Sequence, residues 1–138
     1  MATRKKTTPS NPDPSILMEQ FWAFGRTKVL QSAISLQLFD QLAKGPRTAK
    51  AVARGARATE RGVRMILDVL VALQILAKRG DEYSLSPTAR AFLLTDSPMY
   101  LGPMLMHTEL LHRGWDALTE TVRNGLPPRR VEHPQSVD

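Results

Sequence analysis

The chain lacks cysteine altogether, which excludes disulfide bonds and thiolate metal sites. Its three histidines, His107, His112 and His133, have no metal-ligand companions at a useful spacing. No apolar run reaches the roughly 18 residues that a membrane-spanning helix needs, and the N-terminus lacks the apolar stretch of a secretory signal. We therefore expect a cytoplasmic protein with no metal site and no membrane span.

Acidic residues are almost missing between residues 44 and 64, where Glu60 stands alone. The same segment holds seven basic residues: Lys44, Arg47, Lys50, Arg54, Arg57, Arg61 and Arg64. The formal net charge of this segment is therefore +6, the same as that of the whole 138-residue chain. A basic face of this kind fits nucleic-acid binding, but it equally fits a solvated surface or a surface that meets an acidic partner domain.

The chain also lacks the residue sets of common catalytic sites. No Ser/His/Asp set, carboxylate pair or phosphate loop is visible, and the eight glycines are scattered rather than grouped between a strand and a helix. The hydrophobic content of 42% is nevertheless enough for a core, and a chain of this length can bury roughly two thirds of its unfolded surface. We expect one compact domain without a cofactor site of its own.

The distribution of helix signals divides the chain into three parts. Residues 1–14 are basic and proline-rich without apolar periodicity, so we expect a disordered arm. Residues 15–125 form the folded domain. Residues 126–138 are polar and carry no helix or strand signal.

Helices dominate the start of the folded domain. Ser15 is expected to cap a first helix, and Gly25 is expected to bend the chain before a second helix. The second helix and a short third one are expected to end at Gly45-Pro46.

A helix–turn–helix pattern follows. Thr48 is expected to cap a short helix that Gly55 ends, and Thr59 to cap a longer helix that runs to about Leu76. Residues 75–78 and 82–85 are predicted to form two short strands around a turn. A helix–turn–helix followed by a β-hairpin is the winged-helix arrangement.

Two Ser-Pro pairs, Ser86-Pro87 and Ser97-Pro98, signal further helix starts. After Gly102-Pro103 a long helix is expected to run to about Asn124. The predicted fold class is therefore mostly α. It is a winged-helix-like helical domain with a small two-stranded β-hairpin and a long C-terminal helix.

Three ordered groups of residues stand out in this domain: 59–62 with 67–73, then 83–87 with 91–93 and 97–102, then 115–118 with 122–125. In this order and spacing they resemble the dimerisation domain of O-methyltransferase-type enzymes, which use S-adenosylmethionine to methylate small molecules. The resemblance runs from Ser15 to about Pro128. One departure is Gln74, where the family usually has glycine at the end of a helix.

The resemblance implies a domain that forms an intertwined homodimer through interleaved helices. In such enzymes a Rossmann-like catalytic domain follows and carries both the loop for S-adenosylmethionine and the catalytic base. Neither lies in this chain, so the resemblance implies that residues 126–138 are a linker or the start of a catalytic domain that is missing from the chain. We therefore expect no catalytic residue, no cofactor binding and no activity from the chain alone. S-adenosylmethionine is expected only in a longer parent enzyme, whose own catalytic domain and small-molecule acceptor would be partners of this domain.

Association is also indicated by the helix predicted over residues 60–76, in which only Asp68 and Gln74 are polar between Met65 and Leu76. A helix that is apolar nearly all round is buried on more than one side. The second buried side of this helix packs either against a partner subunit or against the rest of the same domain. The predicted dimer-interface residues are Ile16, Leu17, Phe24, Leu67, Leu70 and Leu73.

A candidate substrate surface comes from the long C-terminal helix. Met104, His107, Leu111 and Trp115 share one helical face. The resemblance implies that this helix is part of the wall of the acceptor pocket, where His107 can hydrogen-bond a hydroxyl group. Met18 and Phe21 of the first helix are candidates for the same pocket. Methionine and aromatic residues at this spacing are equally typical of a protein core.

The alternative is a free-standing winged-helix transcription regulator that binds DNA. Its recognition helix would be the helix over residues 60–76. Its DNA-binding residues would be Arg47, Lys50, Arg54, Arg61 and Arg64. Asp68 speaks against this function, because it would face phosphates. A third hypothesis is a domain that binds an aromatic metabolite without catalysing a reaction.

Overall fold

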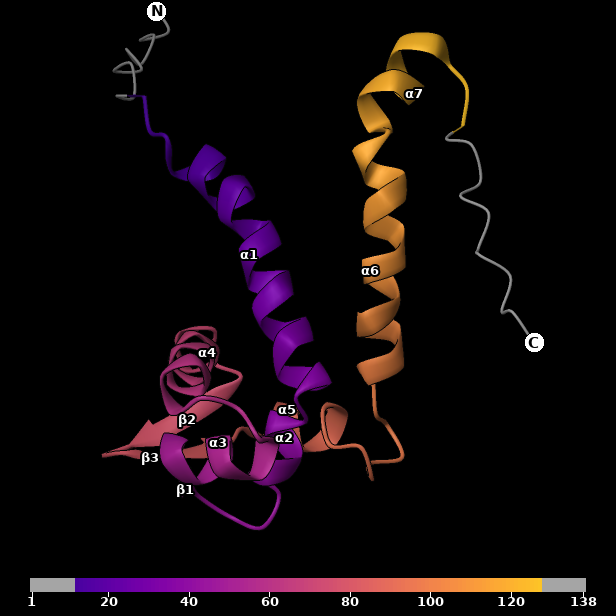
Figure 1. The fold of residues 1–138 in the computed structure, drawn as a ribbon. Helices are drawn as coiled ribbons and strands as arrows, with labels where there is room; N and C mark the ends of the chain where they lie inside the picture. The colour runs from indigo at the N-terminus through magenta and orange to yellow at the C-terminus, as the bar shows by residue number, and fades with distance from the viewer. Residues whose placement is uncertain (1–11, 128–138) are drawn as a thin grey trace, which may run out of the picture.

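The structure is a computed structural model that describes residues 12–127. Most of the predicted arm 1–14, and the last eleven residues of the predicted linker, lie outside this range. The described elements are α1 (Ser15–Ser35), α2 (Leu38–Gln41), β1 (Arg47–Thr48), α3 (Ala49–Ala56), α4 (Glu60–Ala72), β2 (Leu76–Arg79), β3 (Glu82–Leu85), α5 (Pro87–Phe92), α6 (Gly102–Asp116) and α7 (Leu118–Asn124). Helices α1 and α6 leave a compact centre as two diverging arms (Figure 1).

The compact centre is built on the predicted helix–turn–helix. Thr48 accepts a hydrogen bond from the Ala51 amide at 3.3 Å, and Thr59 accepts one from the Gly62 amide at 3.4 Å, so both predicted caps are confirmed. Helices α3 and α4 pack against α2, the C-terminal end of α1 and the sheet. The buried apolar side chains there include Leu38, Phe39, Leu42, Val52, Val63, Leu67, Leu70, Leu76 and Tyr83.

The described sheet has three antiparallel strands in the order β1-β3-β2, so the prediction of two strands missed β1. The hairpin itself is confirmed, with Leu76 opposite Leu85 and Lys78 opposite Tyr83. Strand β1 was missed because it has two residues, of which Arg47 pairs with Tyr83. A strand this short has no period that a sequence pattern can reveal.

Left-handed backbone follows four of the described helices, and at α3 and α4 it differs from the prediction. Helix α4 stops at Ala72, earlier than predicted, and Gln74 at φ 60° turns the chain into β2. Helix α3 runs through Gly55 to Ala56, and Arg57 at φ 53° ends it instead of the predicted glycine. Gly55 has a different role, because the Gln41 side chain occupies the space that a Cβ there would need, at 2.0 Å.

Two predicted helix boundaries in the first part of the chain are wrong. Gly25 does not bend α1, which continues through it as one helix. Nothing lies within 4 Å of a Cβ built at Gly25, so the glycine makes no close contact there. Ser15 is the first helical residue rather than the cap. Its backbone amide and hydroxyl donate to the Asp13 carboxylate at 3.0 and 2.6 Å.

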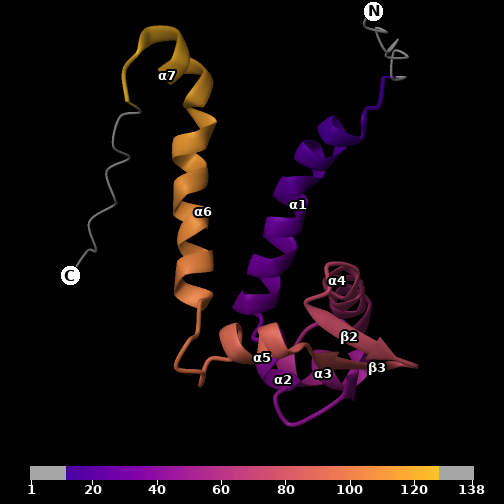
Figure 2. The same cartoon turned by 180° about the vertical axis from the view of Figure 1, so that it is seen from behind.

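The later helices differ from the prediction in a similar way. Ser86 caps α5 and Pro87 follows at its first turn, as predicted. Ser97 starts no helix, because its hydroxyl donates to the Ala91 carbonyl oxygen and accepts from the Met99 amide within a turn. The long C-terminal helix is divided into α6 and α7 at Ala117. Figure 2 shows the two segments forming one arm, with α7 at its far end.

Candidate functional site

The N-terminal half of α1 exposes large apolar side chains in every direction. Phe21 is 69% exposed and Trp22 57%, and Ile16, Leu17, Met18 and Phe24 are also exposed. In the C-terminal half of the same helix, Ala33 and Ile34 are buried in the core. Half of α1 is thus anchored, while the other half projects apolar surface from the domain (Figure 1).

The projecting half of α1 carries two separate apolar ridges. Leu17, Phe21 and Phe24 follow one another at spacings of four and three residues, so they share a face. Gln31 and Ser35 continue the same spacing, and both contact α6. We call these five residues the α6-side stripe. Met18 and Trp22 lie about 100° further round the helix and form a second ridge.

Gln31 is the polar link between α1 and α6. Its side chain is 4% exposed, and its amide nitrogen donates to the Leu105 carbonyl oxygen at 3.3 Å and to the Thr108 hydroxyl at 2.8 Å. The Leu105 oxygen can only accept, so the amide group must present its NH₂ to α6. The Gln31 amide oxygen is then buried without a hydrogen-bond partner among the described residues. A buried acceptor of this kind costs about 1–3 kcal/mol.

The predicted substrate residues of α6 lie along a face that borders the side of the helix facing α1, because Thr108 is one turn from both Met104 and Leu111. Leu105 and Thr108 face α1. Met104, His107, Leu111 and Trp115 are all exposed, Trp115 by 64%, so they are not part of this chain's core. The spacing of three or four residues continues into α7 at Leu118 and Val122, which are also exposed. Met104, Leu111 and Trp115 thus form an apolar strip along α6, and Leu118 and Val122 form a separate exposed apolar pair on α7.

The predicted interface residues do not lie together. Ile16, Leu17 and Phe24 are exposed on α1. Leu67 and Leu70 are fully buried in the chain's own core, and Leu73 is half-buried. Their burial leaves Leu67 and Leu70 no surface for a partner, so we withdraw these two from the interface. The sequence pattern misled because α4 is apolar nearly all round, and Met65 and Val69 are the residues on its exposed side.

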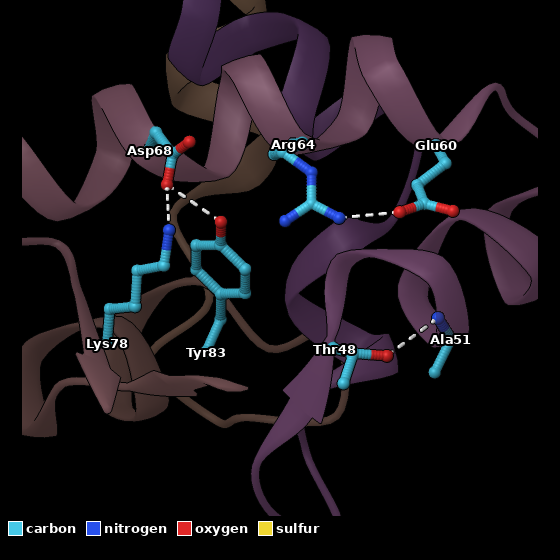
Figure 3. A network of polar contacts seen from close by, with 7 residues as sticks. All are labelled: Thr48, Ala51, Glu60, Arg64, Asp68, Lys78 and Tyr83. Atoms are coloured by element: carbon cyan, nitrogen blue, oxygen red, sulfur yellow. Dashed lines mark hydrogen bonds and ion pairs between the residues drawn. The ribbon is translucent and has the colours of Figure 1, made fainter. Parts of the chain in front are cut away.

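Asp68 forms a polar cluster between α4 and the sheet, which Figure 3 shows at close range. One carboxylate oxygen accepts from the Lys78 ammonium group and from the Tyr83 hydroxyl, both at 2.7 Å. The hydrogen bond from Lys78, followed by that from Tyr83, lowers the pKa of Asp68. The hydrogen bond to Asp68 in turn raises the pKa of Lys78. The Lys78 nitrogen also lies 4.7 Å from the centre of the Tyr83 ring. Neither sequence pattern nor spacing along the chain indicated this cluster.

The predicted DNA-binding residues are spread over β1, α3 and α4. Lys50, Arg54 and Arg61 are exposed. Arg47 and Arg64 are partly buried, and Arg64 forms an ion pair of 2.5 Å with Glu60 one turn earlier (Figure 3). This hydrogen bond raises the pKa of Arg64. The exposed side of α4 therefore carries paired charges, because Glu60 and Asp68 each bind a cation.

A metal or membrane site finds no support among residues 12–127. In that part of the chain no group of three or more histidine or acidic residues is arranged to hold a metal ion. None of the helices described there is both long and apolar enough to cross a bilayer.

Comparison with known proteins identifies the family. The family description "O-methyltransferase dimerisation domain" matches residues 18–95. The N,N-dimethyltransferase OxyT of Streptomyces rimosus is 38% identical over 122 residues, which are 86% of this chain and 36% of OxyT. The solved structure of PigF with bound SAH is 32% identical with a TM-score of 0.77, and the match covers 83% of this chain and 34% of that chain.

A second solved structure agrees with the first. Human N-acetylserotonin methyltransferase in complex with SAM is 31% identical with a TM-score of 0.75, and the match covers 86% of this chain and 37% of that chain. The chain thus spans about a third of the length of these methyltransferases. The chain belongs to the O-methyltransferase dimerisation domain family, whose relatives are methyltransferases that use S-adenosylmethionine.

Proposed function

We propose that the chain is the homodimerisation module of an S-adenosylmethionine-dependent small-molecule methyltransferase and supplies part of its acceptor pocket. The observation that carries this proposal is the N-terminal half of α1, where Ile16, Leu17, Phe21 and Trp22 are each more than half exposed. Exposed apolar patches of this size mark interaction sites in soluble proteins. The domain has a winged-helix-like centre, and α1 is the helix that reaches into the partner subunit.

The exposed surface of α1 supplies most of the area that a stable dimer needs. Ile16, Leu17, Phe21 and Phe24 are each 60–70% exposed. With roughly 150–250 Å² of surface per side chain, they offer on the order of 500 Å² per chain. Two chains would bury about 1,000 Å² through these residues, and contacts of α6 would supply the rest of the roughly 1,200–2,000 Å² of a specific interface.

We assign the subunit interface to Ile16, Leu17, Phe21 and Phe24. Phe21 moves here from the predicted substrate residues, because it shares the α6-side stripe with Leu17 and Phe24. Since this stripe faces the side of α6, a helix of the second copy placed between the two arms would cover it. The resulting dimer is intertwined, with each α1 held by both subunits.

We assign the acceptor wall to the exposed strip of α6, with Met104, His107, Leu111 and Trp115, and to Met18 of α1. Apolar side chains with one polar group, His107, suit an aromatic acceptor that carries a hydroxyl or amino group. From Met104 to Trp115 the strip is about 17 Å long by helix geometry. A small molecule fills only part of that length, so the catalytic domain of the parent enzyme would cover the rest.

DNA binding is less well supported. A reading helix must offer free donors and acceptors to base edges. On α4, Arg64 is paired with Glu60, and Asp68 adds an acceptor that repels phosphate. Met65 and Val69 are exposed beside them. A helix with neutralised cations and apolar side chains on its exposed face fits a protein contact better than a DNA groove.

The dimer is tested by sedimentation of the 138-residue chain and of the double variant Leu17→Ser/Phe21→Ser. We expect a dimer for the wild-type chain and a dissociation constant at least about 100-fold higher for the variant, since central aromatic anchors dominate interfaces. The matched control is Leu118→Ser/Val122→Ser, which removes exposed apolar groups from α7 and should leave the dimer intact. A wild-type chain that is still monomeric at about 100 μM would contradict the proposal.

A further inference from the structure

A second surface lies at the other end of the molecule. Six basic residues on and around α3 form it, and we call them the cationic face: Lys44, Arg47, Lys50, Arg54, Arg57 and Arg61. All but the half-buried Arg47 are exposed. The nearest acid in sequence, Glu60, is bound by Arg64. The cationic face therefore keeps its charge, whereas Arg64 and Lys78 nearby are neutralised by carboxylates.

The cationic face is separate from the proposed dimer surface. Both views place α3 at the end of the molecule opposite to α7 and to the N-terminal end of α1 (Figures 1 and 2). The apolar ridges of α1 lie in its N-terminal half. A second copy that covers those ridges would leave α3 accessible, so an inference about α3 does not rest on the proposed function.

A hollow of about 390 Å³ adjoins the cationic face. Its walls are the end of α1, with Leu36 and Gln37, then Gln41 of α2, and the end of α3, with Gly55 and Arg57. Arg57 belongs to both the hollow and the cationic face. Leu36 is 38% exposed, which gives the hollow an apolar side next to its polar groups.

We propose that the cationic face is the docking site of an acidic protein helix. Its carboxylates pair with Lys50, Arg54 and Arg57, and one of its side chains enters the hollow against Leu36. Lys50 and Arg54 are four residues apart on α3, so their side chains leave the same side of the helix. Glutamates spaced by one turn on a partner helix match this repeat. The arginine fork binds carboxylates in a bidentate manner, which adds geometric selection to the charge.

Charge and shape together favour a protein over a nucleic acid. Duplex phosphates lie on a regular cylinder and can meet the outer cations, but they carry no side chain to fill a recess. The helix that would enter a DNA groove, α4, carries paired charges with Met65 exposed beside them. Apart from Arg61 at the start of α4, the unpaired cations of the cationic face lie on α3 and next to its two ends. A convex helix with an adjoining hollow is the shape that a second helix with one protruding side chain complements.

The test uses the full chain and two fluorescent probes. One is a helical peptide with glutamates at every fourth position and a leucine one turn beyond them, and the other is a mixed-sequence DNA duplex. We expect the peptide to bind more tightly than the duplex at physiological ionic strength. Lys50→Glu/Arg54→Glu should weaken peptide binding at least about tenfold, as repulsion replaces attraction at two close contacts. Circular dichroism confirms that each variant is folded.

The matched control is Arg26→Glu/Arg123→Glu, which changes the net charge equally at exposed positions on α1 and α7, away from α3 (Figure 1). It should change peptide binding less than about twofold, because screened charges at this distance contribute little. Leu36→Ser should weaken peptide binding without a change of charge. Equal losses in both charge-reversal variants, no effect of Leu36→Ser, tighter binding of the duplex, or no binding of the peptide would each overturn the proposal.

Discussion

At the scale of single residues, Asp68 decides how the sheet meets α4. Its carboxylate accepts from Lys78 and from the buried Tyr83, whose hydroxyl has to find a partner inside the domain. The two donors come from neighbouring strands. One acidic side chain therefore satisfies a buried phenol and fixes the hairpin against the helix.

Asp68→Asn should make stability less dependent on pH. The folded-state pKa of Asp68 is lowered, so its contribution is complete above the unfolded pKa and is lost as the pH falls through the folded pKa. The carboxylate is half-exposed, so we expect the variant to lose about 1 kcal/mol at pH 7 and the difference to shrink below about pH 4. Urea unfolding at several pH values measures this.

The control for this experiment is Asp96→Asn, which removes an exposed carboxylate on a turn and should change stability little. A deficit of Asp68→Asn that stays constant from pH 7 down to about pH 3 would mean that the charge of Asp68 has no part in the effect.

Gln31 offers a second residue-scale prediction, because it leaves one amide oxygen without a partner while donating twice to α6. Gln31→Leu removes the unsatisfied acceptor together with the donors, so we expect a change in stability of less than about 1 kcal/mol. Gln31→Glu places a carboxylate against the Leu105 carbonyl oxygen and should cost at least about 2 kcal/mol. Thermal unfolding of the two variants decides, and a larger loss for leucine than for glutamate would contradict the account.

At the scale of secondary-structure elements, the join between α4 and β2 rests on one residue, since Gln74 holds φ 60°. Left-handed backbone costs a non-glycine residue roughly 1–2 kcal/mol. Glycine avoids this cost, but it loses more backbone entropy on folding, which offsets roughly 0.5–1 kcal/mol of the gain. Gln74→Gly should therefore stabilise the domain by about 0.5–1 kcal/mol. Ala72→Gly, two residues earlier in helical backbone, should instead cost about 1 kcal/mol. Chemical denaturation of both variants measures the contrast, and equal losses would refute it.

The sequence predicted those elements whose signals are local. Thr48, Thr59 and Ser86 cap helices where expected, because a cap is a contact between residues three apart. The hairpin was predicted from its alternating pattern. Ser97 does not cap a helix, because its hydroxyl donates to the Ala91 carbonyl oxygen in the last turn of α5. This hydrogen bond depends on where α5 ends, which the local sequence around Ser97 does not show.

The candidate site was less predictable than the fold. The apolar face of α6 follows from spacing alone and is exposed as a surface should be. Leu67 and Leu70 have the same spacing but are buried in the chain's own core. Apolar periodicity shows that a helix face is covered, but it does not distinguish the chain's own core from a partner subunit. The Asp68 cluster joins α4 to two strands of the sheet, and no pattern along the chain predicts such a tertiary contact.

At the scale of the whole molecule, the chain has surfaces for association but no described site for chemistry. In the described residues the hollows border α3 and the outer face of the sheet, and neither combines the glycine-rich turn and helix start that a nucleotide-like cofactor needs. The apolar arms and the cationic face lie at opposite ends of the molecule (Figure 1). Apolar contacts through the arms and charged contacts through the cationic face therefore occur at different places on the molecule.

We expect the 138-residue chain neither to bind S-adenosylmethionine nor to transfer its methyl group to a phenol. Isothermal titration with the cofactor should show no saturable heat up to about 1 mM, the weak end of specific binding. Mixing the chain with a separately produced catalytic domain of a relative is the positive control for the assay. Saturable cofactor binding by the chain alone would show that the domain holds a site of its own.

The projecting half of α1 also has a consequence for how the protein must be made. Helix α1 precedes every other described element, so its bare aromatic residues leave the ribosome before the rest of the fold exists. Surface of this kind favours aggregation until it is covered. If only a second chain can cover it, refolding yield should pass through a maximum with protein concentration. Too few chains leave α1 without a partner, and too many bring unfolded chains together first.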